Sequence, residues 1–289
     1  MTGGWFIVDV VGPVPSVLRI GANRKQWRPL SNEFRGAVHR TIVRLVETVI
    51  YNRKQSQTLV DLSARTSAVA CPVLGSTRVV HGVLLWIGEH GEVPSDQPVT
   101  NVWEWDLADC GAPAPDRPCP VETAVTSTEL LSRLVRPGDI MELANDVRTA
   151  RAGFHRVGEW LTVGAELYRY SSHCVRGFDG LRMVVLSVRT GERVPDTHPE
   201  LVARRVMDAT CRMSGVAPAL VSARTGRVLA WLSSNRPDDG VTDGVGPGRG
   251  GQWTRDVDAV SAGGGPGTEL LPGYPDLSLA VFRRTPGAG

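Results

Sequence analysis

The chain has 289 residues, enough for two or three domains and too many for one small module. Hydrophobic residues make up 42% and charged residues 21%, which suits a buried core and excludes wholesale disorder. The formal net charge of +2 provides no overall field that would attract nucleic acid or an anionic membrane. No apolar run approaches the roughly 20 residues of a membrane-spanning helix, and residues 1–11 lack the basic start of a signal peptide. We therefore expect a cytoplasmic protein without membrane insertion and without a nucleic-acid partner.

The first predicted domain covers residues 1–100. Apolar side chains at helical spacing over residues 34–49, with charged residues between them, predict an amphipathic helix that packs on a sheet. Gly12 and Gly75 mark turns between β-rich runs, which predicts two hairpins. The β-rich runs span residues 5–11, 16–20, 67–74 and 79–87. The order is therefore strand, strand, helix, strand, strand.

The second predicted domain covers residues 101–195 and repeats this plan. Strict alternation over residues 102–107 predicts a strand with one buried face, and a proline-rich loop follows at 111–120. Thr126 and Glu129 form a capping box that predicts a short helix, and a second short helix follows. The two helices span residues 126–135 and 139–147, and the later strands span 159–163, 166–175 and 181–188.

The third predicted domain, residues 196–289, is a connecting helix followed by a shortened module. An apolar stripe over residues 199–213 predicts the helix, and Gly215 ends it. The predicted strands span residues 219–222, 228–232 and 277–283. Residues 233–268 are rich in Gly and Pro and lack helical periodicity, which predicts a long loop.

Strand pairs separated by helices favour antiparallel sheets, because adjacent strands joined by short turns must run in opposite directions. We therefore predict an α+β protein of three tandem modules, each with helices packed on one face of its sheet.

Short motifs in all three segments resemble an actinobacterial family, known from mycobacteria, of three-domain PAS/GAF-like proteins without an assigned biochemical function. The motifs are Gly4–Asp9, His81–Gly88, Trp105–Leu107, Ala219–Val221 and Leu229–Leu232. The resemblance implies tandem PAS/GAF-like sensory modules that signal through protein contacts. The Gly-rich stretch after Asn235 departs from the fuller third domain of that family.

Motifs for catalysis, metal binding and nucleotide binding are missing from the sequence. The glycines of residues 244–251 neither follow a strand nor open a helix, as a dinucleotide fingerprint requires. The five cysteines are scattered without a zinc or disulfide spacing, so we expect reduced thiols. His173 and Cys174 are neighbours on a predicted strand and point to opposite faces, which argues against a Cys-His couple. We predict no catalytic residue, no metal site and no cofactor.

An aromatic cluster in the second domain is the candidate ligand site. Trp103 and Trp105 share one face of a strand, as do Tyr168 and Tyr170, so their rings could line a common wall. Packing in a hydrophobic core explains the same spacing. The candidate ligand-binding residues are Trp103, Trp105, His155, Trp160, Tyr168 and Tyr170.

We therefore expect a non-enzymatic sensor or adaptor that acts through an unidentified protein partner. In one form of this hypothesis, a small apolar ligand controls the contact with that partner. The alternative is a haem- or cofactor-binding protein, or an enzyme, whose site is assembled only in space. Cys71-Pro72 and Cys119-Pro120 resemble the Cys-Pro pairs of some haem-responsive proteins and keep that alternative open. A homodimer through module edges or the helix near Val206 is a further hypothesis.

Overall fold

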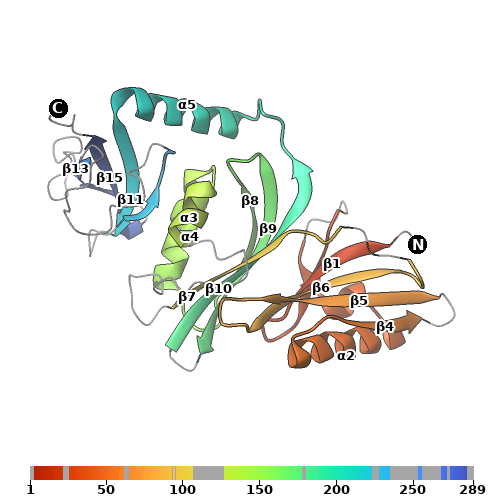
Figure 1. Ribbon diagram of the computed structural model, residues 1–289. Coiled ribbons are helices and arrows are strands. Elements are labelled where there is room, and N and C mark those ends of the chain that lie inside the picture. The colour runs from red at the N-terminus through yellow and green to blue at the C-terminus, as the bar shows by residue number, and fades with distance from the viewer. Residues whose placement is uncertain are drawn as a thin grey trace. The chain divides into compact units, whose positions relative to one another are not determined.

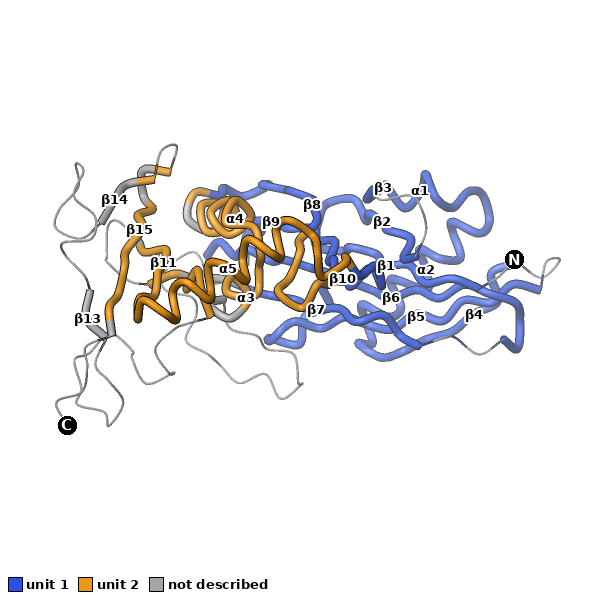
Figure 2. The backbone as a smooth tube through the Cα atoms, turned by 90° about the horizontal axis from the view of Figure 1, so that it is seen from above, with its two compact units in different colours: residues 1–124, 150–159, 166–193 blue, residues 125–149, 160–165, 194–289 orange. Residues whose placement is uncertain are grey.

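The computed structural model divides by its contacts into two compact units. Unit 1 comprises residues 1–124, 150–159 and 166–193, and unit 2 comprises residues 125–149, 160–165 and 194–289 (Figure 2). The structure describes residues 3–21, 26–61, 65–92, 94, 96–106, 127–177, 180–222, 228–234, 253–255, 268–271 and 274–284. The predicted loop at 111–120, the cap residue Thr126 and the glycines of 244–251 lie outside these ranges.

The first sheet of unit 1 has six antiparallel strands in the order β3-β2-β1-β6-β5-β4. These strands are β1 Gly4–Asp9, β2 Ser16–Arg19, β3 Arg28–Pro29, β4 Ser56–Asp61, β5 Thr66–Leu74 and β6 Val80–Glu89. Both predicted hairpins are confirmed, because β1 pairs with β2 and β5 pairs with β6. The sequence pattern does not predict β3, which has two residues, or β4, in which only Val60 is buried.

Helix α2 Gly36–Asn52 covers one face of the six-stranded sheet, as Figure 1 shows, and confirms the helix predicted over residues 34–49. Burying an aliphatic side chain stabilises the fold by about 1.5–3 kcal/mol, so an apolar stripe of four such residues holds the helix to the sheet. The stripe is Ile42, Leu45, Val46 and Val49, and it packs with Phe6, Val8, Ala68 and Leu85. Arg53 caps the C-terminus of α2 with a left-handed φ of 55°. The short helix α1 Leu30–Glu33 lies just before α2 in the chain.

The second sheet of unit 1 has four strands in the order β7-β10-β9-β8. They are β7 Thr100–Asp106, β8 His155–Leu161, β9 Glu166–Gly177 and β10 Gly180–Arg193. One face of this sheet packs on the face of the first sheet that α2 leaves uncovered. We call the apolar cluster formed there the inter-sheet layer; it contains Trp5, Ile7, Leu18, Val73, Leu84, Trp86, Leu186 and Val188.

Gly82 on β6 permits a close approach inside the inter-sheet layer. A Cβ atom at this position would lie 2.8 Å from Cδ2 of Leu186 and 3.3 Å from the carbonyl oxygen of Val8. Leu186 is buried, so its side chain has little room to turn away. The absence of a side chain at Gly82 therefore allows the two sheets to reach this spacing.

Unit 2 contains the third sheet, with strands in the order β12-β11-β15-β13 and with β14 also paired to β15. The strands are β11 Val216–Ser222, β12 Val228–Trp231, β13 Trp253–Arg255, β14 Thr268–Leu271 and β15 Tyr274–Arg284, and the helices are α3 Ser127–Arg133, α4 Pro137–Thr149 and α5 Pro199–Ser214. Helix α5 ends at Gly215 with a φ of 65°, which confirms the predicted connecting helix and its cap. The hairpin of β11 and β12 is also confirmed.

Two arginines connect helix α5 to the segment between α3 and α4. The Arg204 guanidinium donates a hydrogen bond of 3.1 Å to the carbonyl oxygen of Leu134 and lies 3.4 Å from Asp208. Arg136 pairs with Glu200 at 2.7 Å. Arg204 is buried, so its contacts compensate a charge that would otherwise be costly there, whereas the Arg136–Glu200 pair is half-exposed and stabilises the unit less.

The fold is therefore α+β, with antiparallel pairing in every described strand pair that has a register. The three domains 1–100, 101–195 and 196–289 stay a prediction. Among the described residues, none of the helices combines the length and the apolar character needed to cross a lipid bilayer.

Candidate functional site

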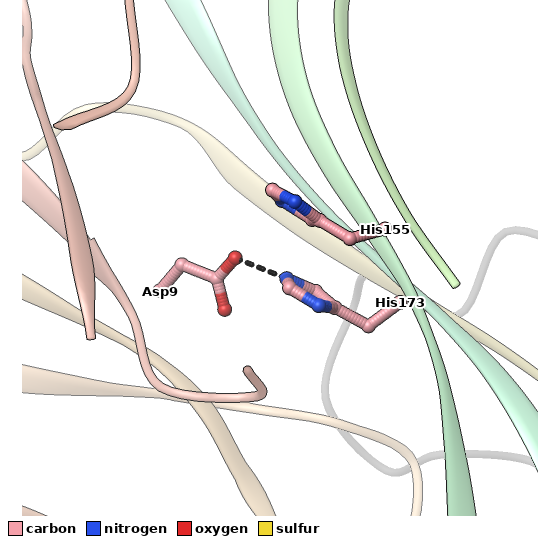
Figure 3. Close-up of side chains that lie close together, drawn as sticks. All are labelled: Asp9, His155 and His173. Carbon is pink, nitrogen blue, oxygen red and sulfur yellow. Dashed lines mark hydrogen bonds and ion pairs between the residues drawn. The ribbon is translucent and has the colours of Figure 1, made fainter. Parts of the chain in front are cut away.

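Four polar side chains from both sheets of unit 1 meet beside the inter-sheet layer. Asp9 is the last residue of β1, and strand alternation places it on the same face as Trp5 and Ile7. Ser171 and His173 share one face of β9, and His155 begins β8. We call these residues the Asp9 cluster. Figure 3 shows both histidine rings directed toward the Asp9 carboxylate.

Short hydrogen bonds connect the members of the Asp9 cluster. The Ser171 hydroxyl donates to Asp9 Oδ2 at 2.5 Å, and His173 Nε2 lies 2.6 Å from the same oxygen. Ser171 Oγ also lies 3.0 Å from His173 Nε2 and 3.3 Å from His155 Nε2. The two imidazole rings stack with centroids 4.4 Å apart and an interplanar angle of 18°.

The pKa values of Asp9 and His155 are both lowered in the cluster. Asp9 is 1% exposed and His173 is 6% exposed, whereas His155 is exposed. Burial opposes the ionised form of Asp9, but hydrogen bonds from His173, Ser171 and the Val11 amide hold the pKa of its carboxyl below the ordinary value. Desolvation, followed by the neighbouring His173, lowers the pKa of His155. The ionised carboxylate and neutral imidazole are the forms that bind metal ions.

The Asp9 cluster contains the residue types of a Ser-His-Asp triad but not its geometry. In such a triad the histidine uses one ring nitrogen for the carboxylate and the other for the serine. Here both Asp9 Oδ2 and Ser171 Oγ approach the same nitrogen, Nε2 of His173. The ring therefore does not connect the serine to the carboxylate, and this arrangement does not activate Ser171 as a nucleophile.

A second polar cluster, the Glu104 cluster, also joins the two sheets. Glu104 on β7 pairs with Nε2 of His81 on β6 and accepts a hydrogen bond from the Ser76 hydroxyl. The Thr77 hydroxyl donates at 3.4 Å to Glu104 Oε1, the oxygen that His81 contacts, whereas Ser76 donates to Oε2. Burial raises the pKa of Glu104, but His81, Ser76 and the Arg182 charge outweigh it and lower the pKa to about 2. His81 is the extra residue at a register shift between β5 and β6.

The structure divides the predicted aromatic site between two faces of the second sheet. Trp103 on β7 and Ser172 on β9 both pair with Val185 of β10, so their side chains lie on the same face of the sheet. Tyr170 and Tyr168 precede Ser172 on β9 by two and four residues and therefore share that face. His155 instead joins the Asp9 cluster. Trp160 is buried and belongs to unit 2, and the Trp105 side chain lies outside the described residues. Whether the aromatic face binds a ligand stays a prediction.

Each of the two tyrosines on this face makes a contact within the second sheet. The Tyr170 ring occupies the space beside Gly158, where a Cβ atom would lie 2.7 Å from the tyrosine hydroxyl oxygen. The Tyr168 hydroxyl donates to Glu166 at 3.4 Å. These contacts are compatible with packing as well as with a binding wall.

No disulfide joins the described cysteines, which are Cys71, Cys174 and Cys211. Burial raises the pKa of the Cys71 and Cys174 thiols, which favours the unreactive thiol form. Cys110 and Cys119 lie outside the described residues.

Sequence reasoning missed Asp9 and His173 as partners because 164 positions separate them. Local patterns identify strand faces, and a polar residue at the end of an apolar run was the only signal at Asp9. The partner of such a residue becomes visible only when the sheets are packed.

Comparisons with known proteins address the family and the fold. The family model described as Rv3651-like, N-terminal, matches residues 4–96. The chain is 18% identical to an uncharacterised protein from Mycobacterium tuberculosis, covering 98% of this chain and 94% of that chain with a TM-score of 0.65. The family model thus covers only the N-terminal part of the chain, residues 4–96, and the structural likeness to the mycobacterial protein concerns the fold alone.

A weaker structural match is the periplasmic sensory domain of the Campylobacter jejuni chemoreceptor Tlp1. It is 9% identical, covers 63% of this chain and 70% of that chain, and has a TM-score of 0.19, which is too low to carry an argument. No curated protein matches the chain significantly.

Proposed function

We propose that the protein is a non-enzymatic sensor or adaptor of three tandem PAS/GAF-like modules, residues 1–100, 101–195 and 196–289, that acts through a protein partner. Antiparallel sheets with a helix on one face, as in the sheet covered by α2, support this proposal. The hydrolytic alternative lacks support from the Asp9 cluster, because His173 does not connect Asp9 to Ser171.

The observation that carries the proposal is the pair of polar clusters that cross-link the two sheets of unit 1. Each cluster needs a group from each sheet, so a relative shift of the sheets would leave a buried carboxylate without its partner. Such a junction favours discrete arrangements over continuous sliding. A ligand or partner selects between arrangements only if it binds them with different affinity.

The proposal is tested by photo-crosslinking the full-length tagged chain in an actinobacterial host, with Glu104→Gln as the junction variant. Glu47→Gln, an exposed position on α2, is the matched control. We expect a crosslinked partner that is retained by the control and changed in amount at least about threefold by the junction variant. Identical crosslinking by all three proteins would contradict a role for the junction in partner binding.

The second candidate function is a cofactor-binding protein or an enzyme, and the convergence of two histidines and a carboxylate in the Asp9 cluster is the observation that favours it. An absorption spectrum and native mass spectrometry of the purified chain distinguish the candidates. The sensor proposal predicts no Soret or flavin band, and its ligand-gated version predicts a retained small apolar molecule.

A homodimer remains part of the proposal, with the exposed side of α5 at Val206 as the contact. We expect multi-angle light scattering to give twice the mass of the chain at high concentration. A monomer at every concentration would remove this element of the proposal and leave the partner experiment unaffected.

A further inference from the structure

The geometry of the Asp9 cluster points to a binding site for a divalent transition-metal ion, with Asp9, His155 and His173 as ligands and zinc as the expected occupant. One potential ligand atom from each residue lies within 4.8 Å of the other two. Binding itself does not depend on the sensor proposal, although a role for the ion as the sensed ligand would rest on it.

The donor set determines the class of ion. Imidazole nitrogen suits zinc, copper, nickel and iron, whereas magnesium and calcium prefer sites made of oxygen ligands. Two imidazoles and one carboxylate leave a fourth position for water or substrate, as in zinc sites with three protein ligands. Zinc is therefore the natural first probe, and Co²⁺ is its spectroscopic substitute.

The distances allow an ion to enter after a small rearrangement. Zinc bonds of about 2.1 Å place tetrahedral ligand atoms about 3.4 Å from one another. His173 Nε2 and Asp9 Oδ2 are closer than this, at 2.6 Å, and the widest separation in the group is at most 4.8 Å. Shifts of about 1 Å thus reach ligand geometry. His155 is exposed at the start of β8, so its ring can turn and the ion can enter from solvent.

The residues around the three ligands support them. The Val11 amide donates to Asp9 Oδ1 at 2.9 Å, which leaves Oδ2 directed at the histidines. The Ser171 hydroxyl donates to Oδ2 and lies within hydrogen-bond distance of Nε2 of both imidazoles. Gly12 provides room for the His173 ring, because a Cβ atom there would lie 3.0 Å from Cε1. Outer contacts of this kind orient metal ligands and tune affinity.

The site has an electrostatic reason to accept a cation. Asp9 is 1% exposed, and a carboxylate charge in such a position is costly unless a positive charge or hydrogen bonds compensate it. Hydrogen bonds now provide that compensation. A metal ion would replace the contact with His173 by two ligand bonds and would tie β1 to β8 and β9.

The test is calorimetric titration of the chelator-treated full-length chain with zinc chloride, with His155→Gln as the main variant because its side chain is exposed. His90→Gln, an exposed histidine of the same unit, is the matched control. We expect one equivalent of zinc to bind and His155→Gln to weaken binding at least about 100-fold, since loss of an outer contact alone costs about 10–100-fold. His90→Gln should bind as the wild type does.

Cobalt provides a second readout that reports the ligands directly. We expect visible d–d bands of a low-coordinate Co²⁺ complex in the wild type and in His90→Gln, and their loss in His155→Gln and Asp9→Asn. Absence of stoichiometric zinc binding by the wild type, or unchanged binding by His155→Gln, would overturn the metal site. The crosslinking experiment changes Glu104, which is not one of the three ligands, and measures capture of a partner, whereas the titrations measure metal binding by the purified chain. Failure of one proposal is therefore distinguishable from failure of the other.

Discussion

Two carboxylates of unit 1, the buried Asp9 and the partly buried Glu104, each pair with a histidine of the opposite sheet. Asp9 belongs to the first sheet and meets His173 of the second, whereas Glu104 belongs to the second sheet and meets His81 of the first. Neither pair could be predicted from the sequence, because each joins residues from different strands whose packing no local period reveals. His155 was predicted as a site residue, but as part of an aromatic wall instead of the Asp9 cluster.

The Glu104 cluster makes stability depend on pH. The folded pKa of about 2 lies below the ordinary value of 4.5, so the stabilisation is complete above about pH 4.5 and is lost as the pH falls toward 2. We expect Glu104→Gln to lower the free energy of unfolding by about 2 kcal/mol at neutral pH. Urea unfolding should show this difference shrinking between pH 4.5 and pH 2. A difference that is constant with pH would contradict the proposed ionisation.

Two buried serines of the second sheet form a matched pair for the Asp9 cluster. Ser171 donates to Asp9, whereas the Ser187 hydroxyl has no hydrogen-bond partner in the described part of the chain. We expect Ser171→Ala to cost about 1–3 kcal/mol, because it removes a donor to a buried carboxylate, and Ser187→Ala to be neutral or stabilising. Urea midpoints measure both, and equal losses would contradict the assigned contact.

Helices and strands whose apolar residues recur at a clear period were predictable from the sequence. Short strands without such a period were not. The α2 helix presents four apolar residues at helical spacing, and the β5–β6 hairpin has long β-rich strands around a turn. Strand β13, with three residues, lies in the Gly-rich region 233–268 predicted as a loop, and strand β14, with four residues, begins at the last residue of that region. They pair with β15, so tertiary pairing, which leaves little local signal, determines them.

Helix α2 offers a test of the packing inferred from its period. Ile42 is fully buried against the sheet, and Ile50 on the same helix is 37% exposed. We expect Ile42→Ala to destabilise the protein by about 3 kcal/mol and Ile50→Ala by less than about 1 kcal/mol. Chemical denaturation of both variants provides the measurement. Similar losses would mean that α2 does not pack through the predicted stripe.

At the scale of the molecule, the sequence predicts the α+β class but not the inter-sheet layer. Leu186 and Val188 were expected in one strand, where their two-residue spacing places them on the same face. No local sequence pattern identifies Trp5 and Trp86 as their neighbours. Packing between two sheets is a property of the folded chain, so the structure was needed to find it.

Leu186 tests whether the two sheets of unit 1 open together. We expect Leu186→Ala to cost about 3 kcal/mol and to increase hydrogen exchange in β1 and β6 as well as in β10. Exchange followed by mass spectrometry resolves these segments, and Ile42→Ala serves as the comparison with a cavity on the opposite face. Faster exchange confined to β9 and β10 would mean that the sheets open independently.

The missing side chain at Gly82 also supplies a criterion for sorting homologues. An alanine at position 82 would place a methyl group in the space that Leu186 and the Val8 carbonyl oxygen occupy. A homologue with a larger residue at position 82 must therefore carry a smaller side chain at position 186 or pack its second sheet at a different distance. Covariation of these two positions across a future collection of relatives would therefore separate chains that inherit this double-sheet arrangement from those that share only the first sheet.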